Sequence, residues 1–93
     1  MTETALAPVP VELPQEGRLY QHYKGDFYRI ITRGHLSEQR AQEMVVYRSM
    51  KYGHVWIRPL EMFIEQVVWP DGKTRGRFVP VAHLPRAADN AKL

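Results

Sequence analysis

Turn signals that contain glycine divide the middle of this chain into short runs of aromatic and β-branched residues. The clearest signals are Lys24-Gly25-Asp26, Lys51-Tyr52-Gly53-His54 and Pro70-Asp71-Gly72-Lys73. Glycine and aspartate tolerate the backbone angles of tight hairpin turns, and aromatic and β-branched residues favour strands. The chain is therefore predicted to fold through successive antiparallel hairpins.

One short helix is expected among the strands. Pro59 suits the first position of a helix, where its missing N–H costs nothing, and the apolar residues after it are spaced for one helical face. We expect this helix from Pro59 to about Glu65, and Pro80 is expected to place the last strand at a sheet edge. The polar segment Ser37–Glu43 has no apolar face and is expected to form an exposed loop. Strands are predicted at 19–23, 27–33, 44–49, 55–58, 66–69 and 77–81.

Short strands joined by hairpins, with a helical turn before the last hairpin, favour a mostly β fold. We predict a small antiparallel SH3-like barrel of five to six short strands with one short helix. An α+β fold with a bent antiparallel sheet is the alternative.

Basic and aromatic residues are concentrated in the middle of the 93-residue chain. Residues 17–86 hold twelve lysines and arginines against six acidic residues, whereas the first 16 residues hold three glutamates, three prolines and no basic residue. A segment of that composition buries too little apolar surface to fold by itself. We expect a disordered tail at 1–16, a single small β-barrel domain at 17–84 and a flexible C-terminal tail at 85–93.

Composition and motifs argue against several classes of function. The sequence has no cysteine, which excludes disulfides and cysteine-ligated zinc, and no apolar run approaches the length of a membrane helix. Met1-Thr2-Glu3-Thr4 does not begin a signal peptide, so a cytoplasmic location is expected. The four histidines lie apart without metal-ligand spacing, and there is no nucleophile elbow or phosphate loop. We expect no catalytic residue, cofactor, metal or membrane contact.

The hairpin expected at 44–58 predicts two different faces, because side chains alternate along a strand. Odd positions are expected in the core, with odd residues opposite odd ones across the hairpin. Even positions combine cations with one large ring and are expected to face away from the core. Arginines of the preceding strand are expected to join them, with an ordinary solvated exterior as the alternative. The predicted core residues are Val45, Tyr47, Val55, Ile57 and Phe63, and the predicted binding face is Arg29, Arg33, Arg48, Trp56 and Arg58.

Three segments of the chain resemble a small bacterial family described only as a domain of unknown function. The segments are His22-Tyr23-Lys24-Gly25, Val45-Val46-Tyr47-Arg48 and the more specific Trp56-Ile57-Arg58-Pro59-Leu60-Glu61-Met62-Phe63. The resemblance covers about Leu19 to Pro80, and Gly34–Glu43 looks like the variable loop of the family. It implies a compact, mostly β domain and carries no activity, substrate or catalytic residue.

An uncharacterised binding or adaptor module is the function that these observations favour. Arginine guanidiniums and aromatic rings stack on unpaired bases, and the same residue types dominate protein interfaces. The predicted partner is therefore a peptide or protein, or a single-stranded nucleic acid. A small-ligand-binding or enzyme-accessory domain without its own catalysis is the alternative.

Overall fold

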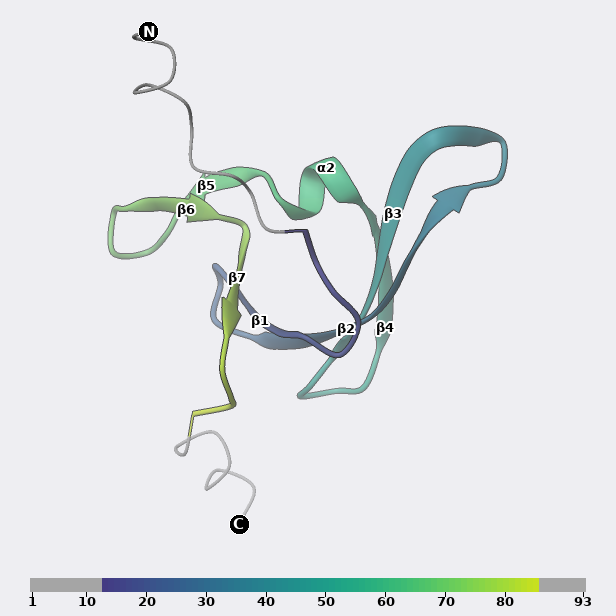
Figure 1. The fold of residues 1–93 in the computed structure, drawn as a ribbon. Coiled ribbons are helices and arrows are strands. Elements are labelled where there is room, and N and C mark those ends of the chain that lie inside the picture. Colours follow the sequence, from purple (N-terminus) through teal and green to yellow (C-terminus); the bar gives the residue numbers. More distant parts are fainter. Residues whose placement is uncertain (1–12, 86–93) are drawn as a thin grey trace, which may run out of the picture.

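A long antiparallel hairpin, formed by β2 and β3, is the largest element of the fold. The computed structural model describes residues 13–85, and strands account for most of its regular structure. Figure 1 shows the tip of this hairpin extending beyond the rest of the molecule. The elements are β1 (Leu19–His22), β2 (Phe27–Leu36), β3 (Gln39–Ser49), β4 (Val55–Pro59), α2 (Leu60–Phe63), β5 (Gln66–Val68), β6 (Thr74–Gly76) and β7 (Phe78–Val81).

Five strands form one antiparallel sheet in the order β4-β3-β2-β1-β7, and β5 and β6 form a separate two-stranded sheet. The five-stranded sheet is bent, so that β4 and β7 lie on either side of a central space (Figure 1). Its concave side is called the inner face below, and the opposite side the outer face. A mostly β fold with one short helix is confirmed. The sheet does not close into a barrel, because β4 and β7 are its two edges.

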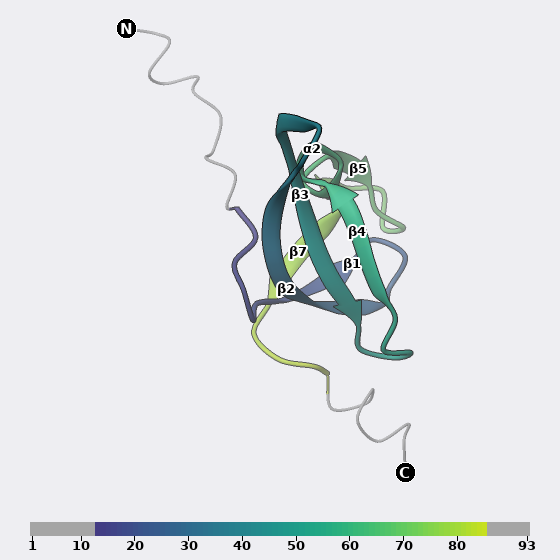
Figure 2. The same ribbon diagram turned by 90° about the vertical axis from the view of Figure 1, so that its right-hand side faces the viewer.

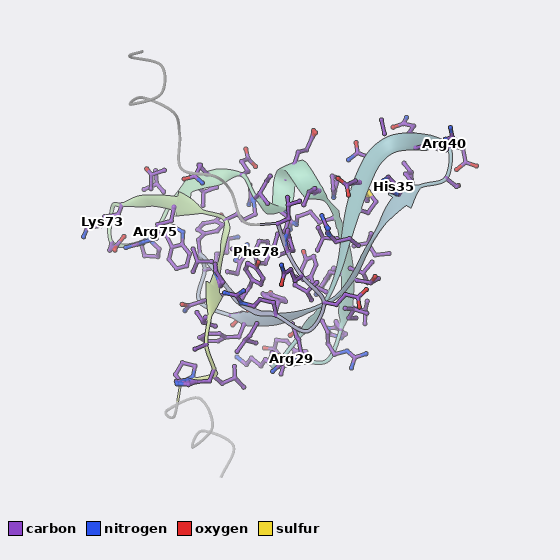
Figure 3. The ribbon with its side chains drawn as sticks, in the orientation of Figure 1. Arg29, His35, Arg40, Lys73, Arg75 and Phe78 are labelled. Carbon is purple, nitrogen blue, oxygen red and sulfur yellow. The ribbon has the colours of Figure 1, made fainter. Side chains whose placement is uncertain are left out.

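The core lies against the inner face and consists mainly of aromatic rings. Phe63 is 1% exposed and stacks on Phe78 with ring centroids 4.0 Å apart. Tyr47 meets both rings edge-on, an arrangement worth about 0.5–1.5 kcal/mol per pair beyond simple burial. Figure 3 shows Phe78 among the side chains that fill the central space. The buried cluster is Tyr20, Ile30, Val45, Tyr47, Phe63 and Phe78.

Helix α2 closes one end of this core. Pro59 is its N-cap residue, and Leu60, Phe63 and Ile64 pack on or within the buried cluster. Three of the four residues predicted to share one helical face therefore pack on the core, whereas the fourth, Val67, lies in the strand that follows. The helix itself is a single turn, Leu60–Phe63, and is shorter than predicted, since a tight turn at Ile64 leads directly into β5.

The polar segment after Gly34 forms strand instead of the predicted loop. β2 runs to Leu36, β3 starts at Gln39, and only two residues connect them. Most side chains near this tip are exposed. A hairpin that extends beyond the core has no buried face to mark with apolar residues, so the period-two signal is missing.

The last strand pairs differently from a simple closing hairpin. β5 pairs with β6 around the predicted turn, where Gly72 has a φ of 88°, and β7 returns to pair with β1. β7 is an edge of the five-stranded sheet, which confirms the position expected from Pro80.

Part of the predicted N-terminal tail, residues 13–16, lies within the described residues. Pro14 is fully buried, and the hydroxyl of Thr32 donates a hydrogen bond of 2.9 Å to the carboxylate of Glu16. Residues 13–16 therefore lie against the sheet. The tails predicted at 1–16 and 85–93 otherwise fall outside the described residues.

Candidate binding site on the inner face

The five residues of the predicted binding face are divided between two faces of the sheet. Arg29 lies directly opposite Arg48 on the outer face, and Val55 is the next residue across the sheet. Arg33 and Arg58 lie on either side of the buried Val45, which places both on the inner face. Trp56 lies opposite Tyr47 and belongs to the inner face as well. Figure 3 shows Arg29 beyond the sheet as seen from Phe78.

The turn between β3 and β4 causes this division. Ser49 donates its amide hydrogen to the carbonyl oxygen of His54 at 2.8 Å, which leaves four residues in the turn. An even number of turn residues pairs odd positions with even ones, as in Tyr47 with Trp56. The expected pairing of odd with odd is therefore wrong, and Val55 and Ile57 point outward, 49% and 64% exposed. Burial of Tyr47 and Phe63 is confirmed.

A β-bulge in β2 separates Arg29 from Arg33. Ile30 pairs with Tyr47 and Thr32 with Val46, so Ile31 is an extra residue in the strand. An extra residue reverses which face the following side chains occupy. Arg33 consequently turns to the inner face, where it lies 3.8 Å from the carboxylate of Glu43.

Arg58 is the best-placed cation of the inner face. Its Nε donates a hydrogen bond of 3.0 Å to the hydroxyl of Tyr47, and its guanidinium carbon lies 5.9 Å from the centre of the Phe78 ring. The ion pairs found among residues 13–85 join Arg33, Arg75 and Arg77 to carboxylates and do not include Arg58. Arg58 therefore brings a positive charge to the edge of the aromatic core and holds it there through neutral groups.

His22 lies beside this charge and is held neutral. Burial lowers the pKa of His22 to about 4, with further lowering by the positive charges of Arg58, Arg77 and Lys24. Its ring contacts Phe78 edge-on at 4.8 Å, and its Nδ1 accepts the amide hydrogen of Lys24 at 3.2 Å. A neutral imidazole with Nδ1 as acceptor carries its hydrogen on Nε2. His22 is thus a neutral donor close to Arg58.

Tyr28 completes this neighbourhood. Burial, followed by the negative charge of Asp26, raises the pKa of Tyr28, so its hydroxyl stays protonated. Its ring meets Tyr47 and Phe78 edge-on at 5.4 and 5.7 Å. We call His22, Tyr28, Tyr47, Arg58 and Phe78 the His22–Arg58 cluster.

Exposed rings continue from this cluster along β4 and its turn. Trp56 is 52% exposed and meets His54 edge-on at 6.2 Å, and His54 stacks with Tyr52 at 6.0 Å. The Lys51 ammonium lies 5.2 Å from the centre of the Tyr52 ring. We call Tyr52, His54 and Trp56 the aromatic strip. It has Lys51 at one end and Arg58 at the other.

Of the residues in these two groups, only Trp56 and Arg58 belong to the binding face predicted from the sequence. Positions 52, 54, 56 and 58 all carry a ring or a guanidinium, a period-two signal that was present in the sequence. Tyr47 is buried as predicted, but its hydroxyl also reaches Arg58 at the edge of the core. Tyr28 and His22 come from other strands, so only the fold brings them to Arg58.

Residues 13–85 contain no group of three His, Asp or Glu side chains placed to hold a metal ion. Among the same residues, no helix has the length and apolar character needed to cross a membrane.

Comparisons with known proteins place the chain in a family. A family model described as "Protein of unknown function (DUF1653)" matches residues 18–80. A crystal structure of a protein belonging to DUF1653 from Bordetella bronchiseptica is 28% identical in sequence, with a TM-score of 0.63. The match covers 76% of this chain and 92% of that one. A comparison with curated proteins gave no match. The chain belongs to the DUF1653 family.

Proposed function

We propose that this domain is a binding module that holds single-stranded nucleic acid against the aromatic strip and performs no chemistry of its own. The observation that carries the proposal is the row of alternate positions 52, 54, 56 and 58, of which the first three carry a ring and the last a guanidinium. Exposed aromatic rings stack on bases of any sequence, and each stacked base contributes about 1–3 kcal/mol.

Charge supports a polyanionic partner. Residues 13–85 contain eleven lysines and arginines against seven aspartates and glutamates. Arg33, Arg75 and Arg77 are engaged with carboxylates, whereas Lys51 and Arg58 stand at the two ends of the strip. Cations that flank a stacking surface are suited to bind the phosphates on either side of stacked bases.

The His22–Arg58 cluster favours a second candidate, the binding of a small anionic ligand. Arg58 is partly buried, and no ion pair among residues 13–85 joins it to a carboxylate. Tyr28 and His22 offer neutral donors beside it. A carboxylate or phosphate would supply the missing negative charge. Such a ligand suits the enzyme-accessory role expected as the alternative.

We also keep two predictions from the sequence as proposals. The first is that the fold is SH3-like, and the second is that the protein is cytoplasmic. A strongly bent five-stranded antiparallel sheet with a helical turn before its last strand supports the first. A sequence without cysteine is compatible with the second.

The test is the binding of short fluorescently labelled single-stranded RNA and DNA, followed by anisotropy at low and moderate salt. Trp56→Ala should weaken binding by about 1–3 kcal/mol, and Trp56→Phe should retain most of the affinity because it keeps a ring. Arg58→Gln should reduce the salt dependence by about one phosphate contact.

Circular dichroism of each variant separates lost binding from lost folding. Failure of the wild-type chain to bind either polymer at low salt would overturn the proposal. Equal affinity of the wild type and a folded Trp56→Ala variant would do the same. Competition by inorganic phosphate alone, with no effect of Trp56→Ala, would favour the small-anion candidate.

A further inference from the structure

The two edges of the five-stranded sheet differ in the backbone groups that they present. Tyr23 donates its amide hydrogen to the carbonyl oxygen of Arg77. In an antiparallel pair, the backbone groups of successive residues point alternately toward and away from the partner strand. Counting from Arg77, the backbone groups of Pro80 therefore point away from β1. Proline has no N–H to offer a further strand. Proline on an edge is a recognised protection against added strands. The β7 edge is therefore partly blocked.

The β4 edge keeps its donors. Ser49 donates to the carbonyl oxygen of His54, and the same alternation then directs the N–H and C=O groups of Val55 and Ile57 away from β3. Among residues 13–85 no backbone hydrogen bond to either residue is found outside the β3–β4 ladder. In Figure 2, no strand lies beside β4 on the side away from β3.

The side chains on this edge are apolar and exposed. Val55, Trp56 and Ile57 are 49%, 52% and 64% exposed, and no charge interrupts them. Natural edge strands are normally blunted by charges, prolines or covering elements. Pro59 ends the strand, but the three residues before Arg58 have none of these protections.

We propose that two copies of this chain pair through β4 as antiparallel strands related by a two-fold axis at Trp56. Val55 of each copy then lies opposite Ile57 of the other, and the four outward N–H groups meet four outward C=O groups. Moving the axis to Ile57 would place Val55 opposite Pro59, which has no N–H to donate to the Val55 carbonyl oxygen. With the axis at Trp56, every outward N–H and C=O group of Val55 and Ile57 is paired.

A second copy fits this edge in side-chain chemistry as well. On the outer face, each Val55 meets an Ile57, and both lose exposed apolar surface. On the inner face, the two Trp56 rings are neighbours and Arg58 lies opposite His54 of the second copy rather than opposite another arginine. The contact uses the same patch of both copies, as a two-fold interface requires.

The experiment is sedimentation of the full chain without nucleic acid, from low micromolar to millimolar concentration. The wild type should change from monomer to dimer over this range. Ile57→Pro removes one outward N–H from each copy without touching a bond to β3, and it should raise the dimer dissociation constant by about tenfold or more. Ile57→Lys should do the same by placing a charge on the edge.

Leu36→Lys is the matched control, because it adds the same charge to an exposed apolar position at the tip of the β2–β3 hairpin. It should dimerise like the wild type. A wild type that stays monomeric throughout would overturn the proposal, and so would an Ile57→Lys variant that dimerises normally. Ile57 lies on the outer face, so failure here leaves the nucleic-acid test at Trp56 unaffected.

Discussion

Arg58 and His22 show how two polar side chains are accommodated beside an aromatic core. Arg58 keeps its charge and is held by the Tyr47 hydroxyl, while His22 gives up its charge. A second positive charge next to a half-buried guanidinium would be repelled and poorly hydrated. The pair therefore has one cation and one neutral ring at neutral pH.

This arrangement predicts a loss of stability in mild acid. The unfolded chain binds a proton on His22 near pH 6.5, and the folded chain does so only near pH 4. Between these values the unfolded state holds more protons, so the free energy of unfolding decreases as the pH falls through this window. We expect His22 to contribute about 1 kcal/mol of this decrease, because solvent screening reduces the effect for a half-buried group.

Urea unfolding of the wild type and of His22→Gln at pH 7.5 and pH 4.5 measures this contribution. Glutamine keeps an acceptor near the Lys24 amide but takes up no proton. The variant should therefore lose less stability than the wild type between the two pH values. Equal losses would show that the pKa of His22 is the same in the folded and the unfolded protein.

At the level of single residues, the sequence predicted a binding face whose members the fold divides between two faces of the sheet. Trp56 and Arg58 could be chosen because large rings and guanidiniums are typical of recognition surfaces. Their association with Arg29 and Arg48 depended on strict alternation through β2 and across the β3–β4 turn. Ile31 as an extra residue and a turn of four residues both interrupt that alternation.

Among the elements, the β3–β4 hairpin was predicted correctly in position but wrongly in register. The sequence Val55-Trp56-Ile57-Arg58 has a large apolar side chain at three successive positions, so either face is a plausible core face. Turn length decides between them, and a run of polar and glycine residues does not fix the number of residues in a turn. Burial of Phe63 did not depend on register, because helical spacing alone placed it.

The register finding predicts unequal costs for two truncations. Phe63→Ala removes a fully buried ring and should cost about 3–5 kcal/mol. Ile57→Ala removes a side chain that is mostly exposed, and it should change the stability of the monomer by no more than about 0.5 kcal/mol.

Urea midpoints measured at a dilution that keeps the chain monomeric give both values. An Ile57→Ala cost similar to that of Phe63→Ala would mean that Ile57 belongs to the core, as the alternation of the hairpin first indicated. A cost below about 1 kcal/mol for Phe63→Ala would contradict the position of α2 over the core.

For the whole molecule, turn chemistry and β-branched residues were enough to predict a mostly β fold. Closure of the sheet could not be predicted, because it depends on which strands meet at the ends rather than on any local pattern. β7 pairs with β1, and no strand among residues 13–85 joins it to β4. The composition of the first 16 residues also does not indicate that Pro14 is buried.

Two deletions test where the folded unit begins. Removing residues 1–16 eliminates the buried Pro14 and the Glu16 carboxylate that accepts from Thr32. The unfolding midpoint should then fall by about 5 °C or more relative to a chain that lacks only residues 1–12. Thermal unfolding followed by circular dichroism compares the two, and equal midpoints would show that residues 13–16 contribute no stability.

The two tryptophans lie in different surroundings, Trp56 in β4 and Trp69 directly after β5. Trp56 is half in solvent on the five-stranded sheet, whereas Trp69 is partly buried, donates from Nε1 to the Gly76 carbonyl at 2.9 Å, and has the Arg75 guanidinium 5.2 Å from its ring. The indole emission of this protein is therefore the sum of two signals from two separate structural units. Single-tryptophan forms would resolve the motions of the small β5–β6 sheet from those of the main sheet without any added label, and a spectrum of the intact chain reports neither one alone.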